Sequence, residues 1–252
     1  MTSINFLGTG TSTGVPEIGC QCEVCNSKDN RDNRLRTSVL IKHQGKTVLI
    51  DCGPDFRYQM IRSKTTHIDA VLITHEHYDH IGGLDDLRPF TRRKDIPIFA
   101  EASVIQKLRE RMPYCFQLNP YPGVPRLNLK EIGLSAFDFD GVEITPIRIM
   151  HGKLPILGFR IGNIAFLTDL TDIPKEEYKK LENLDVLIIG ALRKQQHISH
   201  QTLQEAIAKI NIIKPKQAYI IHTSHHLGLH KDISDELPLN ISLSYDALEV
   251  EI

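Results

Sequence analysis

Thr74-His75-Glu76-His77-Tyr78-Asp79-His80 places three histidines and an aspartate within seven residues, directly after the apolar run Ala-Val-Leu-Ile. Two histidines two positions apart in an extended segment point the same way, so His75 and His77 suit one metal ion. The turn that follows brings Asp79 and His80 toward a second ion. Borderline cations such as Zn²⁺ accept imidazole nitrogen and carboxylate oxygen together. The segment therefore predicts a metal site rather than a polar loop with several histidines.

Further metal ligands must come from other strand ends, and three candidates stand there. His151 follows ITPIRIM, Asp169 ends IAFLT, and His222 ends AYII. Taken alone, each of these residues is more typical of a loop residue whose hydrogen bonds are made by its neighbours. Together with the first motif they complete the ligands that a site for two divalent ions needs.

Three of the five cysteines form the cluster Cys20-x-Cys22-x-x-Cys25. The N-terminal MTSINFLGTG lacks the basic region and apolar run of a secretory signal. We therefore expect a reducing, cytoplasmic setting, in which this cluster binds a metal as thiolates rather than forming disulfides. The alternative is three free buried thiols.

Length and composition fit one domain over residues 1–252, with 41% hydrophobic residues and a net charge of −1. The charge balance makes nucleic acid an unfavoured partner, because nucleic-acid binding needs surplus Lys and Arg. No stretch reaches the roughly 20 apolar residues that span a membrane. A small phosphorylated substrate is compatible with this balance, and a homodimer stays open.

Short apolar runs bounded by turn residues alternate with helical patterns, which indicates a mixed α/β layered fold. We expect strands at residues 4–7, 38–41, 47–50, 70–73, 96–99, 142–149, 158–161, 164–167, 186–189, 217–221 and 248–252. We expect helices at residues 55–62, 84–92, 103–111, 175–181 and 201–210. Gly45 and Asp140-Gly141 indicate hairpin turns, and residues 113–125 a surface loop.

The HxHxDH pattern followed by a lone His, a lone Asp and a lone His at strand ends resembles the metallo-β-lactamase superfamily of hydrolases. The resemblance extends from GTGTSTGVP near the start to YDALEVEI at the end. It implies a four-layer αβ/βα sandwich with two metal ions at the edge of two facing mixed sheets. The implied ligands are, at one ion, His75, His77 and His151; at the other, Asp79, His80 and His222; and, bridging both, Asp169.

A narrower resemblance joins the cysteine cluster to His222-x-x-His225. Together, these two motifs resemble those of the branch that contains the phosphoribosyl cyclic-phosphate phosphodiesterases of the carbon–phosphorus lyase pathway. That branch implies a structural Zn²⁺ held by Cys20, Cys22, Cys25 and His225. A Cys₃His set is a closed tetrahedron with no position left for substrate.

Outside the metal ligands, His200 is the candidate proton donor to the leaving group, as the same branch implies. A histidine suits this role because its unperturbed pKa is about 6.5. It could instead cap the following helix, and His197 is the weaker candidate for the same role. Asp51, at a strand end, suits the orientation of a metal-bound imidazole, although a solvated turn residue is nearly as good an interpretation.

Two remaining features of the sequence are less specific for a function. Gly8-x-Gly10-x-x-x-Gly14 matches neither a dinucleotide loop nor a Walker loop, and we interpret it as close backbone packing beside the metal ions. Three arginines could each clamp a phosphate, without a basis for choosing among them: Arg34, Arg36 and Arg88.

The sequence thus predicts a dinuclear hydrolase, with Asp79 and His200 at its catalytic centre and Zn²⁺ or Mn²⁺ as the catalytic ions. We expect a metal-bound hydroxide to attack small phosphodiesters, cyclic ones among them. Three alternatives stay open. One is a carboxyl ester, thioester or lactam substrate. Another is a role like that of the pyrroloquinoline-quinone biosynthesis relatives, and the last is a metal-binding sensor without turnover.

Overall fold

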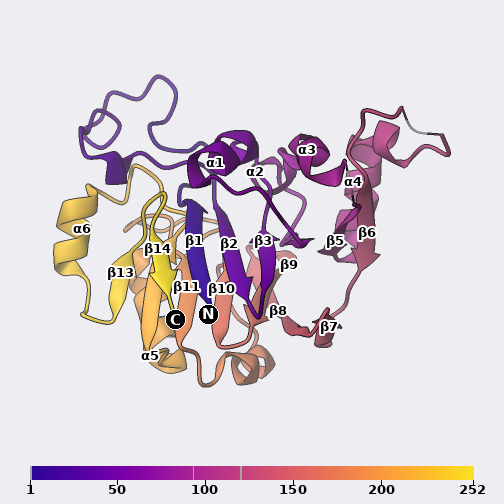
Figure 1. Ribbon diagram of the computed structural model, residues 1–252. Coiled ribbons are helices and arrows are strands. Elements are labelled where there is room, and N and C mark those ends of the chain that lie inside the picture. The colour runs from indigo at the N-terminus through magenta and orange to yellow at the C-terminus, as the bar shows by residue number, and fades with distance from the viewer. Residues whose placement is uncertain (1, 93, 120) are drawn as a thin grey trace.

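Two mixed sheets of seven strands each face one another in the computed structural model, which describes residues 2–92, 94–119 and 121–252 (Figure 1). The first sheet has the order β14-β1-β2-β3-β4-β5-β6. Its strands are β1 (Ser3–Gly8), β2 (Ser38–His43), β3 (Lys46–Ile50), β4 (Ala70–Leu72), β5 (Ile96–Ala100), β6 (Leu127–Glu131) and β14 (Glu249–Glu251). Pairing is antiparallel from β14 to β3 and parallel from β3 to β6.

The second sheet repeats this division into antiparallel and parallel halves, in the order β13-β12-β11-β10-β9-β8-β7. Its strands are β7 (Phe137–Phe139), β8 (Val142–His151), β9 (Leu154–Ile161), β10 (Ile164–Leu167), β11 (Val186–Gly190), β12 (Gln217–Ile221) and β13 (Ile241–Leu243). Pairing is parallel from β13 to β10 and antiparallel from β10 to β7.

Helices cover the outer face of each sheet. Beside the first sheet lie α1 (Phe56–Ser63), α2 (Tyr78–Ile81), α3 (Arg88–Thr91), α4 (Ala102–Arg111) and the 3₁₀ turns η2 (Leu84–Leu87) and η3 (Pro113–Phe116). Beside the second lie η4 (Lys175–Leu181), α5 (Leu203–Ile213) and α6 (His230–Glu236), while η1 (Asn30–Asp32) belongs to the N-terminal loop. No helix of the described ranges is long and apolar enough to cross a membrane.

Three buried apolar clusters hold the layers together. The middle cluster joins the two sheets, with Phe6 of β1 in the same cluster as Phe159 and Phe166 of the second sheet. The outer two pack α1 and α4 on the first sheet and α5, α6 and η4 on the second. Because apolar side chains on both faces of each sheet are removed from water, the hydrophobic effect favours four stacked layers. The predicted αβ/βα sandwich is confirmed.

Most predicted elements are present, and the exceptions have local causes. The helix expected at residues 84–92 is split into η2 and α3, because Pro89 has no backbone N–H to continue the first turn. The one expected at 175–181 is the 3₁₀ helix η4. The sequence did not predict the strands β6, β7 and β13, the helices α2 and α6, or the 3₁₀ turns η1 and η3. The predicted hairpins at Gly45 and Gly141 are confirmed, and both glycines have a positive φ.

The parallel halves bring several strand ends to one edge of the sandwich. The strands β3 and β4 run parallel in the first sheet, as do β10, β11 and β12 in the second. Two antiparallel steps separate β8 from β10, so β8 points the same way. The residues that follow these carboxyl ends therefore gather at the shared edge.

A buried cation ties the N-terminal loop to α6. Arg34 is 5% exposed and donates hydrogen bonds to Thr9 Oγ1 at 2.9 Å and to the Ser244 carbonyl at 2.6 Å. Its other terminal nitrogen lies 3.2 Å from Nδ1 of His230, which must accept because a guanidinium only donates. Burial lowers the pKa of Arg34 to about 10. Burial and the Arg34 charge lower the pKa of His230 to about 4.

Replacing His230 with Gln should flatten the acid side of the stability profile. A histidine with a pKa near 4 in the folded chain and about 6.5 in the unfolded chain takes up its proton on unfolding. Its contribution to stability is therefore complete above pH ~6.5 and falls as the pH approaches 4. Urea unfolding at several pH values should show a shallower decline for His230→Gln than for the wild type. A decline of equal slope would contradict this pKa, and His67→Gln, on an exposed histidine, is the control.

Candidate metal centre

The predicted ligands stand at the shared edge, several of them in an uncommon backbone conformation. His151 is the last residue of β8, and Asp51, Asp169 and His222 follow β3, β10 and β12 within two residues. The last three have φ values of 62°, 54° and 56°. Non-glycine residues seldom adopt a positive φ, and such outliers concentrate at functional sites. In each case a sharp left-handed turn follows directly on a buried strand.

One group consists of His75, His77 and His151, whose nearest ring nitrogens all lie within 4.8 Å of one another. His75 Nε2 is 3.0 Å from His77 Nδ1. Both His75 and His151 are buried, whereas His77 is exposed. This group therefore has one side open to water, on which a substrate can approach.

A second group consists of Asp79, His80, Asp169 and His222, all buried. His80 Nε2 lies 3.1 Å from Asp79 Oδ2 and 3.4 Å from Asp169 Oδ1. His222 Nε2 lies 3.1 Å from Asp169 Oδ1. Yet neither of these ring nitrogens makes a hydrogen bond in the described residues. Buried polar atoms that converge without pairing fit a divalent cation among them.

Asp169 connects the two groups. Its Oδ1 faces His80 and His222, and its Oδ2 lies 3.9 Å from His75 Nε2 in the first group. One carboxylate thus presents an oxygen to each group. The residues present fit two adjacent cations with Asp169 between them.

Charge within the site holds its carboxylates ionised. Burial works to raise the pKa of Asp169, but the adjacent His222 and His80 outweigh burial and lower it well below its usual value. For His75, burial and the neighbouring His80 lower the pKa. At neutral pH, His75 is therefore a neutral imidazole with a lone pair free for a cation.

Two acceptors orient these rings. Asp51 Oδ2 lies 2.6 Å from His80 Nδ1, and Thr74 donates to the same carboxylate through its N–H and its hydroxyl. His151 Nδ1 donates to the Ser199 carbonyl at 2.7 Å, so the proton is on Nδ1 and Nε2 is free. Asp51 thus contacts an imidazole of the site, as the sequence suggested. The roles of Thr74 and Ser199 were missed, because hydrogen bonds between distant segments leave no local pattern.

His200 lies against the site but has more than one conceivable role. Its ring is 4.6 Å from that of His151 and stacks on His222 at 5.1 Å. One of its nitrogens comes within 4.8 Å of ligand atoms on His151 and Asp169, close enough to make His200 an alternative ligand. His197 is farther out, with its ring 5.1 Å from His200. Burial and the adjacent His222 lower the pKa of His200 to about 3.

The glycine-rich loop packs tightly against neighbouring backbone, as the sequence suggested. A Cβ on Gly8 would come within 2.0 Å of the Arg36 carbonyl oxygen, and one on Gly10 within 2.9 Å of Arg34. The arginines that could have clamped a phosphate have protein partners. Arg34 is buried as described above, Arg36 pairs with Asp55, and Arg88 pairs with Asp85.

The cysteine cluster meets His225 as a separate group. The Sγ atoms of Cys20 and Cys22 lie 3.3 and 3.2 Å from His225 Nδ1, and Cys25 completes the set. All three cysteines are unpaired in the described residues. The hydrogen bond from His225 lowers the pKa of Cys22 to about 6, which favours a thiolate. Three thiols and one imidazole fit a closed Zn²⁺ site.

Comparison with known proteins agrees with this geometry. Residues 46–223 match the family described as "Beta-lactamase superfamily domain". A crystal structure described as a new diphosphatase from the PhnP family is 36% identical, with a TM-score of 0.93 over 100% of this chain and 98% of that one. The Zn²⁺-bound PqqB from Methylobacterium extorquens, 16% identical with a TM-score of 0.81, covers 99% of this chain and 100% of its own, and shows the fold alone.

A curated relative is named for a different activity. The octanoyltransferase of Porphyromonas gingivalis is 48% identical over 98% of this chain, but the match covers only 51% of that relative. The chain spans about half the length of the first curated relatives that it matches. Half of the Porphyromonas protein therefore lies outside the match, and its name does not assign an activity to the matched half.

We expect three metal ions per chain, and two substitutions should separate them. Cys22→Ser removes one ligand of the closed set, so it should lose one zinc and lower the melting temperature, because structural zinc binding is coupled to folding. Asp169→Ala should lose one or both of the other ions and keep that zinc. Elemental analysis and thermal unfolding measure both effects.

Cys115→Ser is the matched control, because Cys115 is a half-buried free cysteine outside the cluster. It should keep all three ions. Wild-type zinc content and stability in Cys22→Ser would remove the structural site. A purified, metal-replete wild type with no more than one ion per chain would contradict the two-ion site.

Proposed function

The chain belongs to the beta-lactamase superfamily, in its PhnP-like branch, and we propose that it hydrolyses small phosphate diesters or diphosphates with two divalent cations. This family includes metal-dependent hydrolases, and the branch is the one predicted from the cysteine loop and His225. Zn²⁺ and Mn²⁺ are the proposed catalytic ions, and Zn²⁺ the proposed structural one.

The observation that carries this proposal is the position of Asp169. Its two oxygens face two histidine groups. Within one of these groups the buried Nε2 atoms of His80 and His222 have no hydrogen-bond partner among the residues that the structure describes. Cations bound there would lower the pKa of a water and neutralise charge on phosphate oxygens.

The protein's own groups fix the geometry in which this chemistry happens. Asp51 holds His80, and the Ser199 carbonyl holds His151, so each ring presents its Nε2 to the centre. Asp79, the other proposed catalytic residue, adds a second buried carboxylate to the group that Asp169 shares. Preorganised ligands spare the reaction the cost of arranging them.

His200 is the proposed proton donor to the leaving group. Its pKa of about 3 means that it is neutral before substrate binds. A bound phosphate anion beside the ring would favour the protonated form. A neutral imidazole also retains one N–H, with which it can stabilise the departing oxygen by a hydrogen bond.

Hydrolysis at phosphorus rather than at a carbonyl carbon is supported by the 36% identical relative described as a diphosphatase, which aligns over 98% of its length. An ester or thioester substrate is the second candidate, since the 48% identical relative is named octanoyltransferase. A panel of phosphodiesters, diphosphates, carboxyl esters and thioesters separates the two. We expect turnover of the phosphorus substrates, and turnover confined to the acyl substrates would overturn the assignment.

The two remaining alternatives have less support. The PqqB structure is 16% identical, and a curated coenzyme PQQ synthesis protein B is 28% identical over only 49% of this chain. A sensor without turnover does not need a complete set of ligands, yet every predicted ligand of the two-ion site lies in one of its two groups. The same substrate panel tests the sensor, which would turn over nothing.

His200→Ala should slow the hydrolysis of an alkyl phosphodiester on the order of 10²–10⁴-fold and that of a p-nitrophenyl diester much less. An alkoxide needs a proton as it leaves, whereas p-nitrophenolate is stable as an anion. Steady-state kinetics with the two substrates, together with elemental analysis, measure this difference.

His197→Ala is the matched control, because its ring lies next to His200 but outside the metal groups. It should lose little activity on either substrate. Equal losses on both substrates in His200→Ala would indicate substrate positioning instead, and loss of an ion would make His200 a ligand.

A further inference from the structure

Two hollows run along α3 on the outer side of the first sheet. Their volumes are about 420 and 430 Å³, and both are lined by Thr66, Pro89 and Phe90. The two hollows are therefore adjacent, and we call them together the α1–α3 groove.

Apolar side chains line the half of the groove nearer α1. Phe56, Met60 and Ile61 come from α1, and Phe90 from α3. The rings of Phe56 and Phe90 lie 5.9 Å apart, and Ile61 is 58% exposed. Phe56 and Met60 belong to the buried core and form the floor of the groove. The apolar surface that reaches water is therefore that of Ile61 and of the half-buried Phe90.

Basic side chains surround this apolar surface. Arg57 and Lys64 line the groove from the α1 side, and Arg92 and Lys94 from beyond α3, against a single acidic residue, Asp86. None of these four cations belongs to an ion pair within the part of the chain that the structure describes. The chain as a whole has a net charge of −1, so the excess of positive charge is local.

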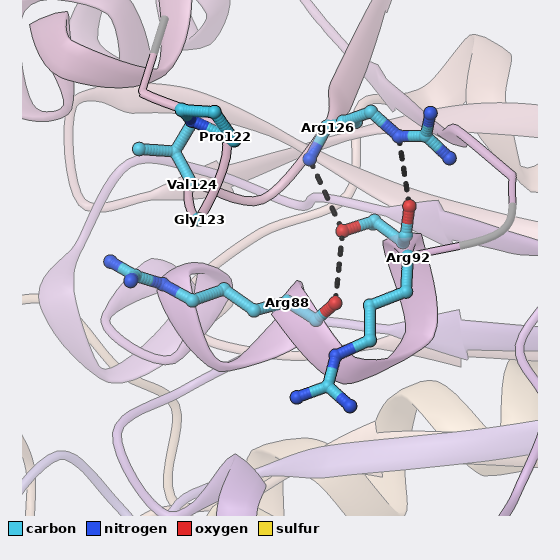
Figure 2. A pocket seen from close by; sticks show the side chains of 7 residues that line it. Arg88, Arg92, Pro122, Gly123, Val124 and Arg126 are labelled. Carbon is cyan, nitrogen blue, oxygen red and sulfur yellow. Dashed lines mark hydrogen bonds between the residues drawn. The ribbon is translucent and has the colours of Figure 1, made fainter.

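The neighbouring pocket shows why a small anion is a poor fit for this region. It is lined by Arg88, Arg92 and Arg126, and Figure 2 shows their guanidinium groups pointing to different sides. Arg88 and Arg126 are also paired with Asp85 and Asp95. A phosphate needs donors that converge on it. Charges spread over a surface instead suit carboxylates spread along an extended partner.

We propose that the α1–α3 groove docks an acidic amphipathic helix of a partner protein. Arg57 and Ile61 of α1 and its C-cap Lys64 are exposed at the spacing of one helix face, so they form a ridge along the groove. Apolar anchors of the partner would enter the groove, and its carboxylates would face the basic side chains. Nucleic acid is the poorer fit, because its phosphates gain nothing from the apolar surface.

The groove is close to the metal centre along the chain. Asp79 and His80 lie on α2, and only Gly82, Gly83 and η2 separate α2 from α3. A docked partner would therefore contact a helix that closely follows α2 in the chain. The docking proposal does not depend on which bond the metal centre hydrolyses.

Fluorescence anisotropy tests the proposal with a labelled peptide of about 18 residues, five helical turns of Leu on one face and Glu on the other. It should bind the metal-loaded wild type and bind less tightly as salt increases. The double substitution Arg57→Glu/Lys64→Glu should weaken binding by about tenfold or more, and Ile61→Ser by several-fold. Hydrolysis of a p-nitrophenyl phosphodiester should be unchanged in these variants.

Lys175→Glu/Lys179→Glu is the matched control, with the same change of charge on exposed residues of η4 beside the other sheet. It should bind like the wild type. Equal binding of a peptide with the same residues in scrambled order would refute recognition of a helix. Tighter binding of single-stranded RNA would assign the groove to nucleic acid instead. Dimers of the wild type that dissociate in Arg57→Glu/Lys64→Glu would make it a contact between two copies.

Discussion

The burial of Asp169 between two groups of histidines is the constraint that the rest of the structure must satisfy. A carboxylate that is 3% exposed stays ionised only where positive charge or donors face it. His75 and His80 reach it from the first sheet, and His222 from the second. These residues therefore come together only when the two sheets are packed in one relative position. The apolar layer between the sheets fixes that position.

Much of this arrangement could be predicted from the sequence. Alternating short apolar runs and helical patterns indicated the layers, and the ligands all stood at the ends of such runs. Parallel strand ends meet at one edge, so residues as far apart as His75 and His222 come together once the topology is right. The sequence also predicted the cluster of Cys20, Cys22 and Cys25, because these residues are close together in the chain.

What could not be predicted depends on contacts between distant segments. The carboxylate of Asp51 is ordered by Thr74, and His151 by a backbone carbonyl whose residue type is irrelevant. Sequence patterning also missed β6, whose side chains are only partly buried, and the division of residues 84–92 at Pro89. The role of His200 was inferred from resemblance, and its position among three other rings admits more roles than its spacing suggested.

The pairing of the two ends of the chain has a consequence for larger architectures. Ser3 of β1 lies opposite Glu251 of β14, and the two termini emerge side by side, away from the edge that bears the predicted metal ligands (Figure 1). A sequence appended at either end would thus begin at the far pole of the molecule. Further sequence could be joined there without closing the approach past His77, and the match covers about half of one longer relative. The ends of the chain and the proposed catalytic centre lie at opposite poles, so a change at one pole need not alter the other.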